Sequence, residues 1–238
     1  MADVLTNKET NKDEKFVNWG TNWATVLPEL IGEDLKQKIY DNTLFNLMGD
    51  LKGKTILDYG SGPAVIASRA KKIGADVKVF DISSEMLKAS ANKIGIYNVY
   101  HKIDEIPSNH FDVVLCNLVV CIVPEEAEVA RIALNLRLAL KEDGVTYIGF
   151  CNPKIFNVPE SIIDYRMQTG RKYAECHQYQ KIKKEGGYKI VEMHRPTEWY
   201  ETIFKSVGLN VTSVHLTPSY DLNGRQINDF VILEVRKN

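Results

Sequence analysis

The sequence has almost no net charge, because 30 Lys and Arg residues balance 31 Asp and Glu residues to a formal charge of −1 over 238 residues. Proteins that bind nucleic acids usually carry a basic excess, so the composition gives no reason to expect a polyanionic partner. No apolar run approaches the roughly 18–20 residues that a membrane-spanning helix needs. The N-terminus, MADVLTNKETNKDEK, is polar and does not resemble a signal peptide. We therefore expect a cytoplasmic protein with no membrane partner.

Cysteine is scarce as well, and none of the four cysteines forms a CxxC pair. Three of them, Cys116, Cys121 and Cys151, lie in apolar stretches, where a free cysteine behaves as a small hydrophobic residue. We expect reduced thiols in the core, and neither disulfides nor a metal site.

From residue 54 onward, apolar stretches typical of strands alternate with stretches typical of amphipathic helices. The expected strands are residues 54–60, 76–81, 98–103, 111–119 and 145–151, and the expected helices are residues 64–74, 83–95 and a long one opened by Pro124. Apolar strands separated by helices are typical of a parallel sheet covered on both faces. After a further helix, two strands follow without a helix between them, which predicts an antiparallel hairpin at the sheet edge. These last elements are residues 196–208, 209–216 and 226–237.

Two segments fall outside this alternation. Residues 14–50 have a mostly helical pattern, and residues 152–193 are too long for a plain connection between a strand and a helix. Ligands of open α/β sheets bind beyond the carboxyl ends of the strands, so an insertion after a strand hangs over the site. We therefore divide the chain into an N-terminal helical lid segment, residues 1–50, and a main domain, residues 51–238, in which residues 152–193 form a lid insertion.

The stretch ILDYGSGPAVIA, residues 56–67, reads as a buried strand, a tight glycine turn and the start of a helix. A dinucleotide site needs G-x-G-x-x-G/A, but here Val65 occupies the third position. Pro63 removes an N–H donor where a pyrophosphate would lie, and the charge of Asp58 opposes a phosphate. A P-loop is excluded because no Gly-Lys-Ser/Thr follows.

Two carboxylates flank this turn and favour a different ligand. Asp58 suits a ligand with a positive group, and Asp81 ends the second strand, where a carboxylate can accept both ribose hydroxyls. A ligand with a ribose, a cation and no phosphate is S-adenosylmethionine. The alternative is purely structural: Asp81 can cap a helix, and glycines at such a turn can serve packing alone.

At these residues the sequence resembles the class I S-adenosylmethionine-dependent methyltransferases. LDYGSGPA is similar to that family's first motif, FDIS to its acidic second motif, and FDVVLCNLVVCIVP to its fourth. The LKEDG turn resembles the one before the family's fifth strand. The resemblance implies a Rossmann-like α/β fold with a mostly parallel seven-stranded sheet, an antiparallel C-terminal hairpin and helices on both faces.

The resemblance also implies roles for residues that bind the donor. Asp58 would meet the amino group of the donor, Gly60 and Gly62 would let its methionine part pass, and Asp81 would hold the ribose. The other expected donor contacts are Ile82, Met86, Ile103, Asp104, Asn117 and Leu118. The third motif is irregular in this chain, so Glu105 is the alternative to Asp104.

Methyl transfer needs mainly alignment and exclusion of water, and a general base only when the acceptor must lose a proton early. The family therefore carries no universal catalytic residue to this chain. His177 or His194 is a candidate base because histidine titrates near neutral pH, and the alternative is a surface or cap-stabilising histidine. The candidate acceptor contacts are Trp19, Tyr165, Arg166, Tyr179 and Arg195.

The alternatives for these residues are structural. Arg166, Arg171 or Arg195 can clamp a carboxylate through its bidentate fork, but arginines on lid helices usually pair with acids. Arg195, in MHRPTEWY, can instead anchor the lid to the sheet. Trp19 and Trp23 can either close over the donor or pack in the core. KIKKEGG is expected to be a solvated basic face.

The sequence thus predicts methyl transfer from S-adenosylmethionine to a small-molecule acceptor at O, N or C. Methylation of a tRNA or peptide is the first alternative, although the charge balance makes a nucleic acid a poor fit. A donor-binding protein without methyl transfer is the second. We expect a monomer or a homodimer.

Overall fold

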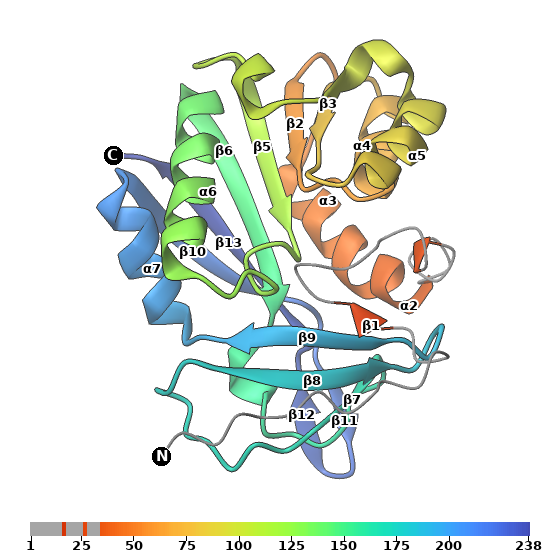
Figure 1. The fold of residues 1–238 in the computed structure, drawn as a ribbon, viewed down its shortest axis with the longest axis vertical. Coiled ribbons are helices and arrows are strands. Elements are labelled where there is room, and N and C mark those ends of the chain that lie inside the picture. Colours follow the sequence, from red (N-terminus) through yellow and green to blue (C-terminus); the bar gives the residue numbers. More distant parts are fainter. Residues whose placement is uncertain (1–15, 18–25, 28–33) are drawn as a thin grey trace, which may run out of the picture.

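The computed structural model describes residues 16–17, 26–27 and 34–238, and its centre is a sheet of seven strands in the order β10-β13-β6-β5-β2-β3-β4 (Figure 1). Five neighbouring strands, β4, β3, β2, β5 and β6, pair in parallel, and β13 pairs antiparallel with both β6 and β10. The strands are β2 (Thr55–Tyr59), β3 (Asp76–Phe80), β4 (Val99–Tyr100), β5 (Phe111–Asn117), β6 (Leu140–Cys151), β10 (Leu209–Leu216) and β13 (Phe230–Lys237). The predicted fold class, with its parallel strands and C-terminal hairpin, is confirmed.

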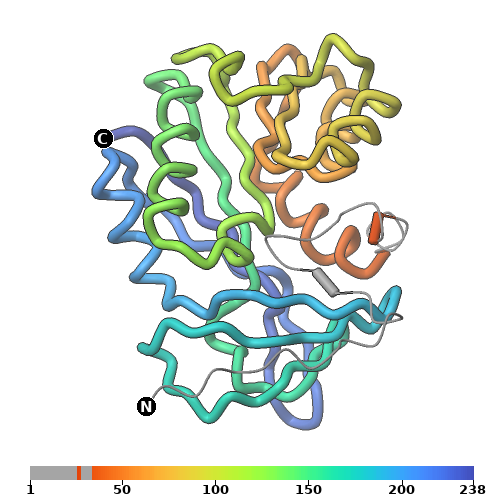
Figure 2. The backbone as a smooth tube through the Cα atoms, in the orientation of Figure 1, coloured from red at the N-terminus to blue at the C-terminus, as the bar shows by residue number. Residues whose placement is uncertain are grey.

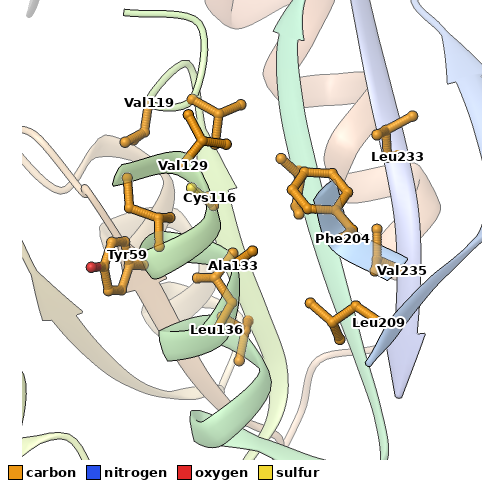
Figure 3. Close-up of a cluster of buried hydrophobic side chains, with 14 of the residues drawn as sticks. Tyr59, Cys116, Val119, Val129, Ala133, Leu136, Phe204, Leu209, Leu233 and Val235 are labelled. Atoms are coloured by element: carbon orange, nitrogen blue, oxygen red, sulfur yellow. The ribbon is translucent and has the colours of Figure 1, made fainter. Parts of the chain in front are cut away.

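Successive residues of a strand point to opposite faces of the sheet, and here both sets are apolar. Helices therefore cover both faces. Leu57 of β2 packs with α6 (Glu126–Ala139) and α7 (Thr197–Ser206) on one face. Its neighbour Ile56 packs on the other face, with α3 (Asn42–Met48), α4 (Val65–Lys72) and α5 (Ser84–Ile94). Figure 3 shows the first of these two cores, where Val129, Ala133 and Leu136 of α6 face the sheet. Each large apolar side chain buried there stabilises the fold by about 1.5–3 kcal/mol.

The insertion after β6 forms a second, small sheet. Its strands are β7 (Asp164–Arg166), β8 (His177–Lys183) and β9 (Lys189–His194), joined by β1 (Phe16–Val17) in the order β1-β9-β8-β7. No strands were predicted from the sequence in this insertion, and the structure builds it from them: buried residues alternate with period two along β8. Figures 1 and 2 show β8 and β9 crossing below the carboxyl ends of β5 and β6, after which the chain returns into α7.

The N-terminal segment is helical only in part. Residues 34–48 run as α2 (Asp34–Lys36), a π-helical turn (Gln37–Asp41) and α3. Phe16–Val17, in contrast, pairs as a parallel strand with β9, an element that the mostly helical pattern did not predict. Residues 18–25, which include the predicted Trp19 and Trp23, lie outside the described residues.

Two predicted strands are shorter than expected. The third strand, expected over 98–103, keeps only Val99–Tyr100, because Ile103–Glu105 turns as a 3-10 helix. The last strand begins at Phe230, and the stretch before it forms a separate two-stranded ribbon of β11 (Tyr220–Leu222) and β12 (Arg225–Ile227). In the part of the chain that the structure describes, no helix combines the length and the apolar character that crossing a bilayer requires.

Candidate active site

The glycine turn between β2 and α4 forms one wall of a cavity of about 690 Å³, a size typical of small-molecule sites. Gly60 has a φ of +72° and Gly62 a φ of +53°, the left-handed region that favours glycine. A Cβ atom on Gly60 would collide with Cγ2 of Val119, whereas one on Gly62 would meet nothing within 4 Å. Gly60 is therefore required by close packing and Gly62 by its backbone conformation alone, and both line the cavity.

Asp81, at the end of β3, holds this turn in place. Its Oδ2 accepts a hydrogen bond from the Gly62 N–H at 2.8 Å, and its Oδ1 accepts one from the Ser83 N–H at 2.9 Å. The cap of α5 is Ser83, whose Oγ accepts from the Met86 N–H at 3.3 Å. Each carboxylate oxygen of Asp81 can accept a second hydrogen bond, so the side chain can clip the turn and still take two hydroxyl groups of a ligand in the cavity that it lines.

Asp58, at the carboxyl end of β2, is a buried carboxyl group on the cavity wall. Burial raises its pKa from 3.8 to about 7, and the cation of Lys36 opposes that rise. A cationic ligand group beside Asp58 would restore the charged form. The position of Asp58 on the cavity wall is thus compatible with a ligand that carries a positive group.

The outer part of the cavity is apolar and open. Ile82 and Ile103 are 58% and 41% exposed, respectively, and both line the cavity, as does the buried Met86. Exposed isoleucines beside a cavity offer flat apolar contact to a planar ring. Asp104, which was expected to contact the adenine, is exposed and is not among the lining residues, which include His101 and Lys102 instead.

Asn117 and Leu118, at the end of β5, form the middle of the cavity. Leu118 has a φ of +59°, a conformation rare for a residue of its kind and frequent at functional sites. The Tyr40 hydroxyl donates to Oδ1 of Asn117, and Tyr40 is fixed between Phe230 and Gly149, where a Cβ atom would collide with its hydroxyl. The amide nitrogen of Asn117 is buried and has no hydrogen-bond partner within the described part of the chain.

The inner end of the cavity is formed by the small sheet and is ionic. Along β8 the inward side chains are Tyr179, Lys181 and Lys183, while Gln178 and Gln180 are exposed. The remaining lining residues at this end are Cys151, Tyr188, Ile190, Glu192 and Phe230. The prediction that KIKKEGG is a solvated face was wrong for Lys181 and Lys183, because both ammonium groups are buried by carboxylates distant in sequence.

Lys181 is the centre of this ionic end. Its Nζ lies 2.6 Å from Glu192 Oε1 and 3.6 Å from Asp164 Oδ2. Glu192 in turn accepts a hydrogen bond on Oε2 from the Tyr179 hydroxyl at 2.8 Å. The Lys181 ammonium group also donates to the Cys151 sulfur at 2.8 Å. Five groups from four strands therefore meet where the carboxyl end of β6 reaches the small sheet.

The structure does not bring the two candidate histidines into the cavity. His177 and His194 are cross-strand neighbours on β8 and β9, with ring centroids 5.0 Å apart, and His194 stacks on Phe156 at 4.0 Å. The Nε2 atom of His194 is 2.7 Å from the carbonyl oxygen of Tyr173. Burial lowers the pKa of His194. Neither histidine is among the lining residues, so a role as general base finds no support in their position.

The described side chains that were predicted to contact the acceptor likewise interact with other groups of the protein. Arg195 donates to the carbonyl oxygens of Val120 at 3.2 Å and Pro124 at 2.7 Å, which ties the end of β9 to the loop after β5. Arg166 is buried against Asp164 at 2.7 Å. The other two do not line the cavity either: Tyr165 is half-exposed under the Lys184 ammonium group, and Tyr179 reaches the cavity only through its bond to Glu192.

Lining residues that the sequence analysis did not assign to the site include His101, Lys102, Lys181, Lys183 and Glu192. The period-two alternation of HQYQKIK was a usable signal for two of them, Lys181 and Lys183. It places Tyr179, Lys181 and Lys183 on one face of a strand.

Known proteins similar to this chain are methyltransferases. A family model described as a methyltransferase domain matches residues 57–148. The ubiquinone biosynthesis O-methyltransferase of Neisseria meningitidis is 30% identical over 113 residues, which are 43% of this chain and 46% of that protein. The ribosomal protein L11 methyltransferase of Dictyoglomus turgidum is 24% identical over 159 residues, which are 64% of this chain and 44% of that protein. The match thus spans less than half the length of either curated relative.

A solved structure extends the similarity to the fold. The S-adenosylmethionine-dependent methyltransferase of Clostridium acetobutylicum superposes with a TM-score of 0.59 at 16% identity, over 90% of this chain and 97% of that one. The superposed 90% of this chain contains most of a fold whose seven-stranded sheet carries Asp58, Asp81 and Asn117 at or next to its strand ends. Residues 57–148 therefore match a methyltransferase domain, and the chain as a whole has the fold of S-adenosylmethionine-dependent methyltransferases.

Proposed function

We propose that the protein transfers the methyl group of S-adenosylmethionine to a small-molecule acceptor bound between the glycine turn and the small sheet. The observation that carries this proposal is a single cavity that joins two different ends. One end has the glycine turn, Asp58 and Asp81, and the other has the buried ionic face of the small sheet. A volume of about 690 Å³ supports a compact acceptor beside the donor.

The residues of the first end fit the donor group by group. Asp58 would hold the donor's ammonium group, which returns the carboxyl group to its charged form. Asp81 would accept from the ribose hydroxyls while it clips Gly62. Ile82 and Ile103 would pack on the adenine. When bound, S-adenosylmethionine supplies a methyl carbon activated by its sulfonium: the acceptor's lone pair forms the new bond, the carbon–sulfur bond breaks, and its electron pair stays on sulfur.

The rest of the chemistry is alignment in a dry site. Tyr40 fixes Asn117, and the small sheet covers the carboxyl ends of β5 and β6, where water would otherwise enter. Holding two reactants in line contributes up to roughly 7–11 kcal/mol in favourable cases. Arg195 would act at a distance, by anchoring β9 to the loop after β5.

Labelled S-adenosylmethionine, incubated with the protein and separated fractions of a cell extract, tests this proposal. We expect label in the small-metabolite fraction, and none when Asp58→Asn or Asp81→Ala replaces the native chain. Label in protein would favour a macromolecular acceptor, as in the relative named for ribosomal protein L11, and label in RNA would favour a tRNA. Donor binding without label in any fraction would indicate a binding protein that has lost transfer.

A further inference from the structure

The inner face of the small sheet carries several buried charged side chains, where apolar side chains would pack equally well. Lys181 and Glu192 are 2% and 4% exposed, and Arg166, Asp164 and Asp229 are equally enclosed. Taking a charge out of water costs several kcal/mol per ion, pairing repays this only when the geometry is good, and apolar residues of similar size often stabilise a core as well or better. A cover that only excluded water would be apolar. The ionic face therefore points to a ligand.

The hydrogen-bonding groups at this face are not used equally. Both oxygens of Glu192 already accept, Oε1 from Lys181 and Oε2 from Tyr179. Asp164 forms an ion pair with Arg166, with Oδ1 and Nη2 2.7 Å apart, and its Oδ2 lies 3.6 Å from Nζ of Lys181. Two groups keep capacity to donate: the amide nitrogen of Asn117, which has no partner among the described residues, and the third N–H of Lys181, which beyond Glu192 and Cys151 has only Asp164 at 3.6 Å, longer than a hydrogen bond. A wall whose spare groups are donors suits a ligand that brings acceptor oxygens.

The charge of Lys181 is permanent under physiological conditions. Burial acts to lower the pKa of Lys181, but the fields of Cys151, Glu192 and Asp164 outweigh burial and raise the pKa well above its ordinary value. An ammonium group of an acceptor placed here would be repelled by Lys181 and by the neighbouring Lys183. A phosphate dianion would add two negative charges beside Glu192 and Asp164. A monoanion avoids the first penalty and brings only one negative charge beside these carboxylates, which Lys181 can balance.

We propose that the acceptor is a carboxylate-bearing small molecule whose carboxylate is held by Lys181 and by the side-chain amide of Asn117. This inference rests on the proposed function, because it names the acceptor class of the same cavity. Lys181 is then an acceptor-binding residue, and Tyr179 and Glu192 are positioning residues that hold its ammonium group at the end of β6.

The first experiment uses the native protein, labelled S-adenosylmethionine and a small-metabolite extract divided into three portions. One portion is untreated, one is depleted on an anion exchanger at pH 8, and one is depleted on a cation exchanger at the same pH. We expect label in the untreated and cation-depleted portions and none in the anion-depleted portion. Label that survives anion depletion overturns the inference. No label in the untreated portion contradicts the proposed function itself, so the two failures are distinguishable.

Two further treatments identify the anion. Phosphatase treatment of the extract should leave labelling unchanged, and its loss would assign the site to a phosphate and overturn the carboxylate. Mild alkali releases label as methanol if the carboxylate itself is methylated and leaves it bound if the carboxylate only anchors the acceptor. Both of these results fit a carboxylate at Lys181.

The second experiment compares Lys181→Met with Lys184→Met, the same change three positions along the chain at a solvent-accessible lysine paired with Glu160. The acceptor is taken from the anion-exchange eluate. We expect Lys181→Met to raise the KM for this acceptor by about tenfold or more, which is the factor that corresponds to the loss of one hydrogen bond to a charged group. The Kd for adenosylhomocysteine, measured by calorimetry, should stay near the native value. Lys184→Met should change neither constant.

A double variant guards against misfolding. Lys181→Met with Glu192→Gln removes both charges of the pair, so no unpaired carboxylate is left buried. It should fold and bind adenosylhomocysteine, and it should keep the raised KM. A native KM in either the single or the double variant would overturn the assignment of Lys181.

Discussion

The replacement Asp58→Asn is predicted to stabilise the ligand-free protein while it abolishes donor binding. Burial raises the pKa of Asp58 from 3.8 to about 7, so the folded chain binds a proton that the unfolded chain has lost between these pH values. The free energy of unfolding of the native protein therefore falls, through Asp58, as the pH rises from about 4 to about 7, and this loss stays constant above pH 7. At pH 8 the cost is roughly 4 kcal/mol, an upper figure from 1.36 kcal/mol per pKa unit. Asparagine keeps the shape of the side chain and escapes this cost.

Urea unfolding of both proteins from pH 5 to pH 8 measures the difference. The advantage of Asp58→Asn should grow with pH up to about 7 and then level off, and calorimetry should find no binding of adenosylhomocysteine to the variant. The native protein should release a proton on binding near pH 6.5, because a ligand ammonium group lowers the pKa of Asp58. A pH-independent difference in stability, or tight binding by the variant, would refute this reasoning.

Asp112 supplies a control of opposite sign. Partial burial acts to raise its pKa, but hydrogen bonds from Lys141 and Thr55 outweigh burial and lower the pKa to about 2. Its contribution to stability is present above the unfolded pKa and is lost as the pH falls through the folded one. Asp112→Asn should therefore lower stability at pH 8 and leave binding of adenosylhomocysteine unchanged.

Three further substitutions test other parts of the site. Gly60→Ala should destabilise the fold by at least about 1–2 kcal/mol through the positive φ alone, with more from the collision with Val119, and should abolish binding of adenosylhomocysteine; native affinity would show that the turn can widen. Arg195→Ala should cost about 3 kcal/mol in urea unfolding because two buried carbonyl groups lose their donor, with little change in the acceptor KM; a large KM effect without destabilisation would make Arg195 an acceptor contact. His177→Ala and His194→Ala should leave kcat near the native value, since both rings lie outside the cavity; a fall of more than about tenfold in kcat would return a catalytic role to one of them.

The parallel sheet and the end of the cavity formed by the glycine turn were predictable because their signals are local. β2, β3 and β5 are apolar runs followed at once by a glycine, an aspartate or an asparagine, so position along the strand fixes both burial and the cavity edge. Asp58, Gly60, Gly62 and Asp81 follow from that pattern. Asp104 did not line the cavity, because a 3-10 turn displaces it and presents His101 and Lys102 instead.

The acceptor end was not predictable in the same way. Lys181 is buried by Glu192 and Asp164, whose positions depend on how β7 and β9 register against β8. A lysine in a polar strand is solvated by default, and only the pairing of the strands overrides that expectation. Arg166 and Arg195 were predicted to bind an acceptor carboxylate through their guanidinium forks. In the structure these guanidinium groups bind a carboxylate and two carbonyl groups of the protein itself.

A crystal structure with adenosylhomocysteine tests the central claim most directly. We expect its amino group within ion-pair distance of Asp58, its ribose hydroxyls on Asp81, and its sulfur facing Asn117 and the Lys181–Glu192 pair. Adenosylhomocysteine bound elsewhere, or its sulfur turned away from the small sheet, would contradict the assignment of one cavity to both donor and acceptor.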